Sequence, residues 1–345
     1  MSLGESPSSP EFGIEAIRRA AERIAPYVAN TPVLSSKVLD AEAGTHVLAK
    51  AEALQVTGSF KFRGALNKVL ASGPGVRTAG IVGYSAGNHA AAIAAVGRIV
   101  GCRAVVVIPT TAPAAKVQNC RSWGAEVVFY DPATQDRAEV AESILAEGNM
   151  EFIPPFDDYD IMAGAGTVGL ELASELDAAG VTPDAVVVGC SGGGLASGVL
   201  TAMEHHFPGI EKYIVEPAGY NKMARSLAAG EVCTNPAPGA TVMDGISGPV
   251  VGDRCLSVLG RLGVTPLSVD DDEALEAVAA AFRYLRVVVE PAGAASLAAV
   301  MSRQLHRSRT YANVALVLSG GNVDPALYGG TISGSGRPFR GALGR

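Results

Sequence analysis

Several features that mark particular classes of protein are scarce or missing in this sequence. Its five cysteines lie far apart and form no C-x-x-C pair, which argues against a disulfide framework and a zinc site and suits reduced thiols in the cytoplasm. The net charge is −7 without a long basic run, so neither a nucleic-acid partner nor a membrane-surface patch is predicted. The most apolar stretch, residues 90–108, is interrupted by Arg98 and Arg103 and is too short to span a membrane. Residues 1–12 lack the apolar core of a signal peptide. With nucleic acids and membranes disfavoured, the expected partner is a small molecule.

The residues that are present predict an α/β protein of two lobes. Of the 345 residues, 48% are hydrophobic and 41 are glycine, which allows a sizeable core that divides into two lobes. From residue 79 onward, strand-like and helix-like segments alternate, and this predicts a parallel sheet with right-handed crossovers. Residues 154–158, Pro-Pro-Phe-Asp-Asp, mark the expected boundary between the lobes. The expected strands are 46–50, 79–84, 104–108, 126–130, 184–189, 212–216 and 313–318, and the expected helices are 14–29, 61–71, 87–100, 113–123, 135–147, 163–177, 195–206, 272–284 and 291–303, with a loop-rich stretch at 230–255.

One lysine stands where a polar loop turns into an amphipathic helix. The segment Thr57-Gly58-Ser59-Phe60-Lys61-Phe62-Arg63-Gly64 places Lys61 in the first turn, behind residues with the chemistry of a helix N-cap. The positive end of the helix dipole and desolvation by the flanking phenylalanines both lower the pKa of such an ammonium. Lys61 is therefore a candidate Schiff-base nucleophile. Taken alone, the segment favours a surface lysine whose stem lies along an apolar face, so other motifs must decide.

Three turns at the ends of predicted strands carry polar or glycine-rich sequences, and ligands of open parallel sheets bind at these carboxyl ends. The first turn, residues 83–89, opens a helix with the sequence Gly-Tyr-Ser-Ala-Gly-Asn-His. Its free backbone N–H groups, with Ser85 and Asn88, form a seat for a carboxylate or a ring oxygen. A plain side-chain cap explains the same residues equally well.

The other two turns suit different parts of one ligand. Residues 190–195 include three consecutive glycines, which let the backbone close around a single phosphate group, although tight packing also produces such turns. Ser319 ends a buried apolar strand, and its hydroxyl needs a partner such as a heteroaromatic nitrogen, a water or a backbone group. Together with a desolvated lysine and a carboxylate seat, these turns describe a pyridoxal phosphate site.

In this order, the four motifs resemble those of the fold-type II pyridoxal-phosphate enzymes, and most closely the serine/threonine dehydratase (ammonia-lyase) and serine racemase group. The resemblance runs from about residue 20 to residue 325. It implies an α/β fold of two lobes, similar to the β subunit of tryptophan synthase, with parallel and mixed twisted sheets flanked by helices and the active site between the lobes. A homodimer is implied by the resemblance alone. The implied parts are a large cofactor-binding domain of residues 13–78 and 158–328, a small domain of residues 79–157 that carries the substrate-carboxylate loop, and flexible tails at 1–12 and 329–345.

Matched position by position, the motifs imply roles for individual residues. Lys61 would bond covalently to the aldehyde of pyridoxal phosphate and move the α-proton, and Phe60 would pack beside the ring. Asn88 would hydrogen-bond the phenolic oxygen of the ring, and Ser319 would meet the pyridine nitrogen. The remaining implied positions are Ser191, Gly192, Gly193, Gly194 and Leu195 for the cofactor phosphate, Ser85, Ala86, Gly87, Asn88 and His89 for the substrate carboxylate, and Gly245 and Glu290 facing the cofactor.

The implied chemistry is elimination of a β-hydroxyl from an amino acid of the L-threonine or L-serine class. A serine hydroxyl, unlike a carboxylate, does not keep the pyridine nitrogen protonated, and this suits an elimination that ends in a 2-oxo acid and ammonia. Racemases of this group carry a second serine where this chain has Ala86, and alanine cannot carry a proton. A dehydratase is therefore predicted. An amino-acid racemase and a non-catalytic pyridoxal-phosphate-binding protein are the alternatives.

Three departures from the family pattern concern the substrate and a metal. Ala91 and Ala165 stand where relatives usually have glutamine, which adds room, and Arg137 matches a position that meets an anionic group in some relatives. A 3-hydroxyaspartate substrate is the resulting hypothesis. In several relatives a divalent cation is held by a glutamate and by an acid six residues later. Here Glu216 is followed at that spacing by Lys222, whose ammonium would take the cation's place, so no divalent metal is predicted.

Overall fold

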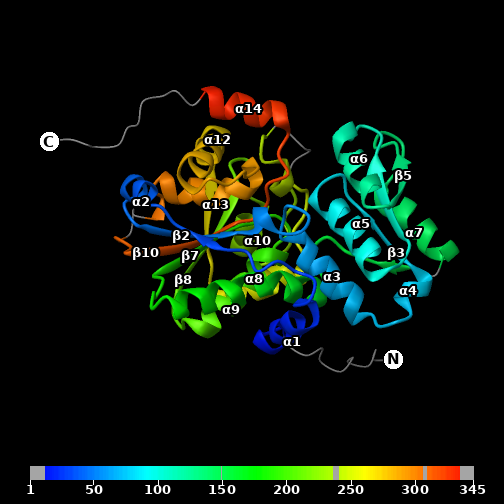
Figure 1. Ribbon diagram of the computed structural model, residues 1–345, viewed down its shortest axis with the longest axis horizontal. Coiled ribbons are helices and arrows are strands. Elements are labelled where there is room, and N and C mark those ends of the chain that lie inside the picture. Colours follow the sequence, from blue (N-terminus) through cyan, green and yellow to red (C-terminus); the bar gives the residue numbers. More distant parts are fainter. Residues whose placement is uncertain (1–11, 149, 236–240, 306–308, 335–345) are drawn as a thin grey trace.

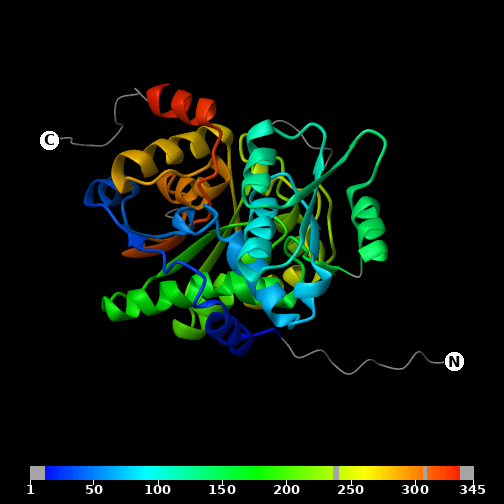
Figure 2. The same cartoon turned by 45° about the vertical axis from the view of Figure 1, so that its right-hand side comes forward.

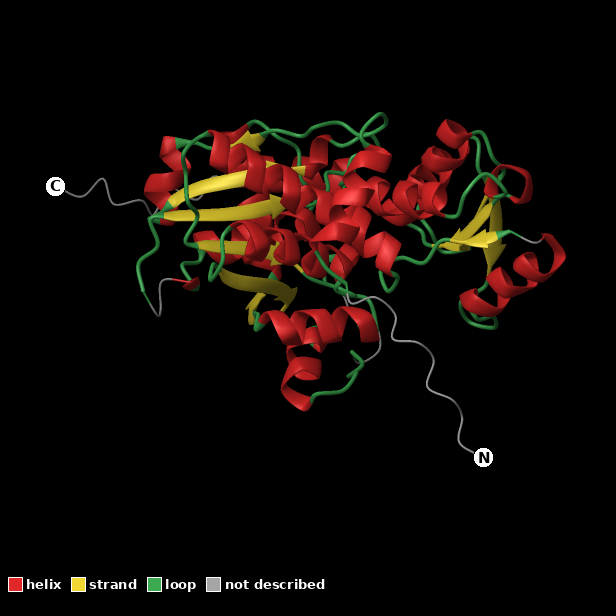
Figure 3. Cartoon of the chain, turned by 90° about the horizontal axis from the view of Figure 1, so that it is seen from below, coloured by secondary structure: helices red, strands yellow, loops and turns green. Residues whose placement is uncertain are grey.

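The computed structural model describes residues 12–148, 150–235, 241–305 and 309–334. Its described strands form a six-stranded sheet, ordered β1-β2-β10-β7-β8-β9, and a four-stranded sheet, ordered β5-β4-β3-β6. Every described pair is parallel except the antiparallel pair of β1 and β2. Figure 3 shows the two groups of strands well apart. The strands are β1 (Val33–Leu34), β2 (His46–Ala51), β3 (Ile81–Tyr84), β4 (Ala104–Pro109), β5 (Glu126–Tyr130), β6 (Glu151–Phe152), β7 (Ala185–Gly189), β8 (Glu211–Pro217), β9 (Thr265–Val269) and β10 (Asn313–Leu318).

Helices follow most of the strands, as parallel crossovers require. Within the part of the chain that the structure describes, no helix is long and apolar enough to cross a membrane. The helices are α1 (Ile14–Ile24), α2 (Lys37–Ala43), α3 (Lys61–Ala71), α4 (Val76–Ala79), α5 (Asn88–Val100), α6 (Ala114–Ser122), α7 (Arg137–Gly148), α8 (Tyr159–Ala178), α9 (Gly194–His206), α10 (Lys222–Ala229), α11 (Asp253–Leu262), α12 (Asp271–Ala280), α13 (Pro291–Met301) and α14 (Pro325–Gly334), with short 3₁₀ turns η1 (Glu52–Leu54) and η2 (Asp244–Ile246) and a π turn η3 (Ala281–Leu285).

Helices cover both faces of the six-stranded sheet. α2, α12 and α13 pack on one face, and α1, α8 and α9 pack on the other (Figure 1). Successive residues of β7 enter the two cores in turn, with Ala185 and Val187 on the α13 side and Val186 and Val188 on the α8 side. Because both faces of the central strands are buried, these strands are continuous apolar runs, which is why the sequence revealed them.

The four-stranded sheet has its own helices. α5 and α6 pack on one face, where Val106 and Ile108 of β4 point, and α7 packs on the other, where Val105 and Val107 point. The view of Figure 2 brings this smaller sheet forward. The strands β3 to β6 all fall between residues 81 and 152. The domain bounds given above stay a prediction, which this separation of the two sheets supports.

The sequence missed several elements of the C-terminal half. The helices α10 and α11 and the edge strand β9 were not predicted. For β9 the reason is that the strand is half exposed and contains a proline. The tail expected from residue 329 begins too early, because α14 continues to Gly334, and residues 335–345 lie outside the described part. Of the expected tail at 1–12, Phe12 is described, and it is buried and stacked on Tyr159 with ring centroids 5.8 Å apart.

Two aspartates act as helix caps in the structure. Asp158 begins α8 by accepting hydrogen bonds from the backbone N–H groups of Asp160 and Ile161. Asp270 forms a capping box with Glu273 at the start of α12. Both carboxylates satisfy N–H groups that a helix leaves unpaired and lie at the positive end of the helix dipole.

Candidate active site

One cleft of about 540 Å³ gathers the chemistry-bearing residues, a size typical of small-molecule sites. Its walls are the start of α3 and the turns that follow β3, β7 and β10, and so both sheets contribute. Every site residue predicted from the sequence lies in this lining, as do Ala91 and Ala165: Phe60, Lys61, Ser85, Ala86, Gly87, Asn88, His89, Arg137, Ser191, Gly192, Gly193, Gly194, Leu195, Gly245, Glu290 and Ser319. The roles of these residues remain predictions.

Lys61 is the first residue of α3, as the sequence predicted. Its Nζ donates a hydrogen bond to the Pro155 carbonyl oxygen at 2.6 Å and lies 5.2 Å from the centroid of the Phe60 ring. Burial lowers the pKa of this ammonium to about 8. The predicted direction of the pKa shift is thereby confirmed, and desolvation is its main cause.

The loop before Lys61 does not cap the helix as the sequence suggested. Phe60 occupies the N-cap position and caps no N–H group with its side chain, while the hydroxyls of Thr57 and Ser59 are buried without a hydrogen-bond partner among the described residues. The loop instead docks on the turn after β10. Ser59 forms an isolated bridge with Gly320, and the Phe60 N–H donates to the Ser319 carbonyl oxygen at 3.1 Å. Lys61 is therefore tied to the Ser319 turn through the backbone.

Asn88 is held from two sides by side chains of the C-terminal region. Its Nδ2 donates to Glu290 Oε1 at 2.6 Å, and its Oδ1 accepts from Asn322 Nδ2 at 2.7 Å. Burial raises the pKa of Glu290 to about 7, although the Asn88 hydrogen bond opposes this rise. Asn322 is a site residue to which sequence reasoning gave no role, even though it stands in the Ser-Gly-Gly-Asn turn after β10.

The turn after β3 offers backbone donors to the cleft. The Ser85 hydroxyl accepts from the Gly87 N–H at 3.1 Å, so it stabilises the turn locally. No residue in the described ranges accepts from the N–H groups of Ala86, Asn88 or His89, which open α5. The His89 ring Nε2 pairs with the Ile153 carbonyl oxygen at 2.9 Å, and burial, then the charge of Lys61, lowers its pKa to about 3. His89 is therefore a neutral donor engaged inside the fold.

The glycine turn before α9 is shaped by close contacts. A Cβ atom at Gly192 would lie 2.3 Å from the Phe156 ring, and Gly193 has a left-handed φ of 104° with Cys255 Cβ 2.6 Å from its own Cβ position. Only glycine fits both requirements. Across residues 192–195, the backbone N–H groups have no acceptor within the described chain. An anion is the natural ligand of such a helix start.

A buried lysine lies directly behind this turn. Lys222 and Glu216 are both fully buried, with Nζ 4.0 Å from Glu216 Oε1, 3.5 Å from Ser191 Oγ and 3.4 Å from the Ile246 carbonyl oxygen. Burial lowers the pKa of Lys222 and raises that of Glu216. The expected proximity of the two side chains is confirmed. The absence of a divalent metal stays a prediction, which strong activation by magnesium would contradict.

Charged side chains form part of the cleft lining. Lys116 of α6 pairs with Asp244 of η2 at 3.0 Å, although these residues are 128 positions apart and no sequence signal joins them. Arg137, the first residue of α7, is exposed and stacks over the Tyr84 ring with its guanidinium carbon 4.9 Å from the centroid. Both cations belong to the lining of the cleft.

Pyridoxal phosphate needs a lysine for its aldehyde, unpaired donors for its phosphate and a partner for its ring nitrogen. The cleft supplies each of these. Lys61 has a lowered pKa, the start of α9 has free N–H groups, and the Ser319 hydroxyl has no hydrogen-bond partner in the described protein. The residues present thus fit the group, and the fold and site define the class of pyridoxal-phosphate enzymes. The family model described as "Pyridoxal-phosphate dependent enzyme" matches residues 24–320, and the chain belongs to this family.

Individual relatives share almost the whole chain. An L-threo-3-hydroxyaspartate ammonia-lyase from Pseudomonas sp is 39% identical over 316 residues, which cover 92% of this chain and 97% of the relative. A serine racemase from Oryza sativa subsp. indica is 38% identical over 314 residues, which cover 90% of this chain and 91% of the relative. Among solved structures, a threonine deaminase from T.th. has a TM-score of 0.85 at 40% identity, covering 90% of this chain and 99% of that one. The predicted fold and cofactor are confirmed.

Proposed function

We propose that this enzyme is a pyridoxal-phosphate-dependent lyase that removes the β-hydroxyl and the amino group of a β-hydroxy amino acid, giving a 2-oxo acid and ammonia. The observation that carries the proposal is the position of Lys61. This residue, with its lowered pKa, lines the same cleft as the free N–H groups at the starts of α5 and α9. The bound cofactor supplies an electron sink for negative charge at the α-carbon of an amino acid.

Lys61 is the residue that we assign to proton transfer. With a pKa of about 8, roughly a tenth of the free amine is neutral at pH 7, far more than for an ordinary lysine. Its hydrogen bond to the Pro155 carbonyl oxygen orients the amine within the cleft. A neutral, oriented amine accepts the α-proton and then donates a proton to the departing hydroxyl.

The turn after β3 is the proposed seat of the substrate carboxylate. The N–H groups of Ala86, Asn88 and His89 have no other acceptor in the described structure and stand at the positive end of α5. The start of α9 takes the cofactor phosphate by the same physics. The His89 ring, with a pKa of about 3, is too weak a base to compete with Lys61 for the α-proton.

The proposed substrate is an L-threo-3-hydroxyaspartate-like amino acid. The exposed Arg137 at the cleft would bind its second carboxylate, and Ala91 and Ala165 leave room beside it. Relatives named L-threo-3-hydroxyaspartate ammonia-lyase, from Pseudomonas sp and Saccharomyces cerevisiae, support this choice.

A panel of β-hydroxy amino acids, assayed by release of 2-oxo acid and ammonia, tests the function and the substrate together. We expect the highest kcat/KM with L-threo-3-hydroxyaspartate and a loss of about 10-fold or more for that substrate in Arg137→Ala, since a charged hydrogen-bond partner contributes about 1.5–3 kcal/mol. L-serine, which lacks the second carboxylate, is the internal control and should change little. Equal kcat/KM for the two substrates in the wild type would contradict the substrate, and no release of 2-oxo acid from any of them would contradict the lyase.

Racemisation is the second candidate function, because several relatives are named serine racemase. Ala86 argues against it, since its methyl group lines the cleft and carries no proton. Chiral chromatography of L-serine incubated with the enzyme should show no D-serine. The variant Ala86→Ser should gain measurable D-serine formation. Exchange of enantiomers by the wild type would overturn this order of the two functions.

We further propose that the enzyme acts in the cytoplasm as a homodimer. Among the described residues no disulfide joins the five cysteines, which supports a reducing compartment. Sedimentation velocity of the full chain would reveal a species of twice the 35.1 kDa chain mass, and a single monomer species would contradict the dimer.

A further inference from the structure

Arg63 lies two positions after Lys61 on the first turn of α3 and is completely buried. Residues two positions apart on a helix point about 200° away from each other. Lys61 therefore points to the cleft, and Arg63 points to the opposite side, where α3 meets η1 and α8. Because both residues belong to the same helical turn, contacts that hold Arg63 in place also determine the direction in which the Lys61 side chain points.

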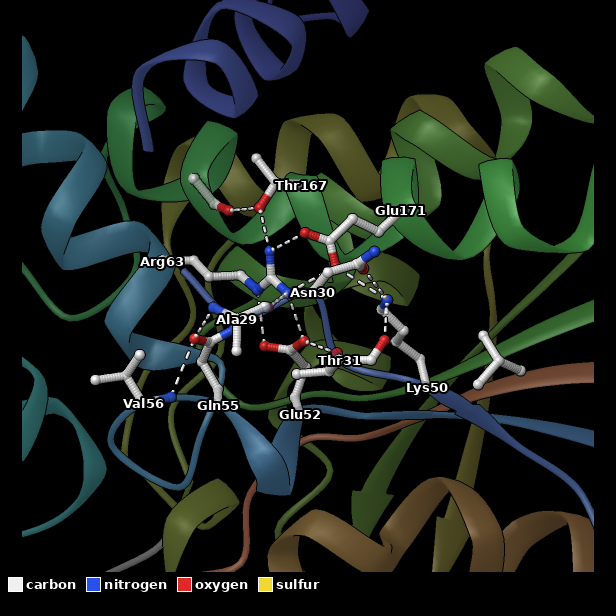
Figure 4. Close-up of polar contacts among 12 residues, drawn as sticks. Ala29, Asn30, Thr31, Lys50, Glu52, Gln55, Val56, Arg63, Thr167 and Glu171 are labelled. Atoms are coloured by element: carbon white, nitrogen blue, oxygen red, sulfur yellow. Dashed lines mark hydrogen bonds and ion pairs between the residues drawn. The ribbon is translucent and has the colours of Figure 1, made fainter. Parts of the chain in front are cut away.

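The guanidinium of Arg63 holds two carboxylates at once (Figure 4). Nε and Nη2 donate to the two oxygens of Glu52 at 2.8 Å each, and Nη1 and Nη2 donate to the two oxygens of Glu171 at 2.6 and 2.8 Å. Nη1 also donates to Thr167 Oγ1 at 3.2 Å, and Nη2 to the Ala29 carbonyl oxygen at 3.3 Å. All three nitrogens are thus engaged, and the planar fork can adopt one orientation only.

The partners of Arg63 are themselves immobilised. Glu52 Oε1 accepts from the Thr31 hydroxyl at 2.6 Å, and Glu171 Oε2 lies 2.9 Å from Lys50 Nζ. Lys50, also fully buried, donates in addition to the Thr31 carbonyl oxygen and to Glu175 Oε1. The network joins the end of β2, the start of α3 and the middle of α8 into one frame.

The backbones of α3 and α8 approach each other closely next to Arg63. A Cβ atom at Gly164 would lie 2.5 Å from the Arg63 carbonyl oxygen, and one at Gly64 would lie 2.9 Å from the Ile161 carbonyl oxygen. The helices therefore touch through their backbones at the level of Arg63. At this contact, the bidentate pairs of Arg63 with Glu52 and Glu171 oppose a rotation of α3 about its own axis.

We propose that Arg63 is a positioning residue, whose double carboxylate clamp fixes the first turn of α3 and thereby aims the Lys61 amine into the cleft. The proposal rests on the proposed function, in that Lys61 is the residue that binds the cofactor. A buried ion pair adds little net stability over apolar packing of the same volume, because desolvation offsets the attraction. The clamp contributes one defined geometry beside the reactive amine.

The test compares the pyridoxal-phosphate-loaded wild type with Arg63→Lys, which keeps the charge and loses the fork. A misplacement of the reactive group by about 1 Å costs up to about 100-fold in rate, so kcat should fall about 10- to 100-fold while KM changes less than about 3-fold. The rate at which Lys61 is fixed to the cofactor by borohydride, measured by peptide mass spectrometry, should fall as well. An Arg63→Lys protein that folds with wild-type kcat and a wild-type fixation rate overturns the proposal.

Glu175→Gln is the matched control, since Glu175 belongs to the same network but does not contact Arg63. Its unfolding midpoint should drop while kcat and Lys61 fixation stay within about 2-fold of wild type. If Glu175→Gln lost as much kcat as Arg63→Lys, the effect would reflect general stabilisation of the fold, and the positioning role of Arg63 would be overturned. Thr167→Val, which removes one hydrogen bond from the guanidinium, keeps the proposal falsifiable if Arg63→Lys does not fold, and it should slow Lys61 fixation about 2- to 5-fold. Failure of the proposed function is recognised separately, as fixation of a lysine other than Lys61 in the wild type.

Discussion

Lys61 and Arg63 are two cations on the same helical turn, and the protein surrounds them in opposite ways. Lys61 has no carboxylate partner in the described structure, and burial lowers the pKa of its ammonium to about 8. Burial also disfavours the charge of Arg63, but the carboxylates of Glu52 and Glu171 outweigh it and raise the pKa of the guanidinium. Desolvation without a carboxylate partner makes a reactive amine, whereas desolvation with two carboxylate partners makes an anchor.

The largest effect should come from removing the amine itself. Lys61→Ala loses both the covalent attachment of the cofactor and the proton carrier, so we expect kcat/KM to fall by at least about 10³-fold. Lys68→Ala is the control on the same helix, because Lys68 pairs with Asp158 at 2.9 Å outside the cleft. Borohydride fixation should disappear in the first variant and persist in the second. A Lys61→Ala protein that releases 2-oxo acid at an appreciable rate would refute the assignment.

Removal of the anchor should also lower the stability of the fold, because it leaves carboxylates buried without their cation. Arg63→Met leaves Glu52 buried without its cation, which should lower the free energy of unfolding by about 3–5 kcal/mol. Arg103→Met breaks the exposed pair of Arg103 with Glu126, whose two side chains are 56% and 51% exposed, and should cost less than about 1 kcal/mol. Urea unfolding of both variants measures the difference. Equal losses of unfolding free energy in the two variants would contradict a stronger dependence of the fold on the buried Arg63 clamp than on the exposed Arg103 pair.

A smaller effect is expected at the phosphate turn. Gly193→Ala and Gly180→Ala both place a side chain at positive φ, at 104° and 68°, which costs about 1–2 kcal/mol in either case. Only at Gly193 would the new Cβ also meet neighbours, Cys255 Cβ at 2.6 Å and Met223 Cε at 2.8 Å. Cofactor affinity, followed by fluorescence titration, should therefore fall about 10-fold or more in Gly193→Ala and stay unchanged in Gly180→Ala. Equal cofactor affinities of the two variants would contradict binding of the cofactor at this turn.

The comparison also explains which parts of the site could be predicted. Lys61 and the glycines before α9 stand in short contiguous motifs, where local chemistry is enough to suggest a ligand. The partners of Arg63 are 11 and 108 positions away, and Lys116 meets Asp244 over 128 positions, so no local spacing indicates either contact. These pairs arise only when β2, α3 and α8, or the two sides of the cleft, come together.

Two errors have different physical causes. Thr57 and Ser59 have the residue types of a helix cap, but docking of their loop on the turn after β10 determines their conformation. The edge strand β9 was missed because it is half exposed and contains a proline, whereas the amphipathic helices α10 and α11 flank residues 230–255, which were interpreted as loop-rich. The central strands, buried on both faces, were predicted within one or two residues.

The pH dependence of cofactor attachment to Lys61 directly tests the lowered pKa that distinguishes this lysine from Arg63. The neutral amine is the nucleophile, so attachment to the cofactor-free protein should accelerate as pH rises through the lowered pKa, with half of the maximal rate at about pH 8. Borohydride fixation at short times, mapped to the Lys61 peptide at each pH, measures this profile. A half-maximal rate near the ordinary lysine pKa of 10.5, or a label on another lysine, would contradict the assignment of a buried Lys61 without a carboxylate partner as the reactive group.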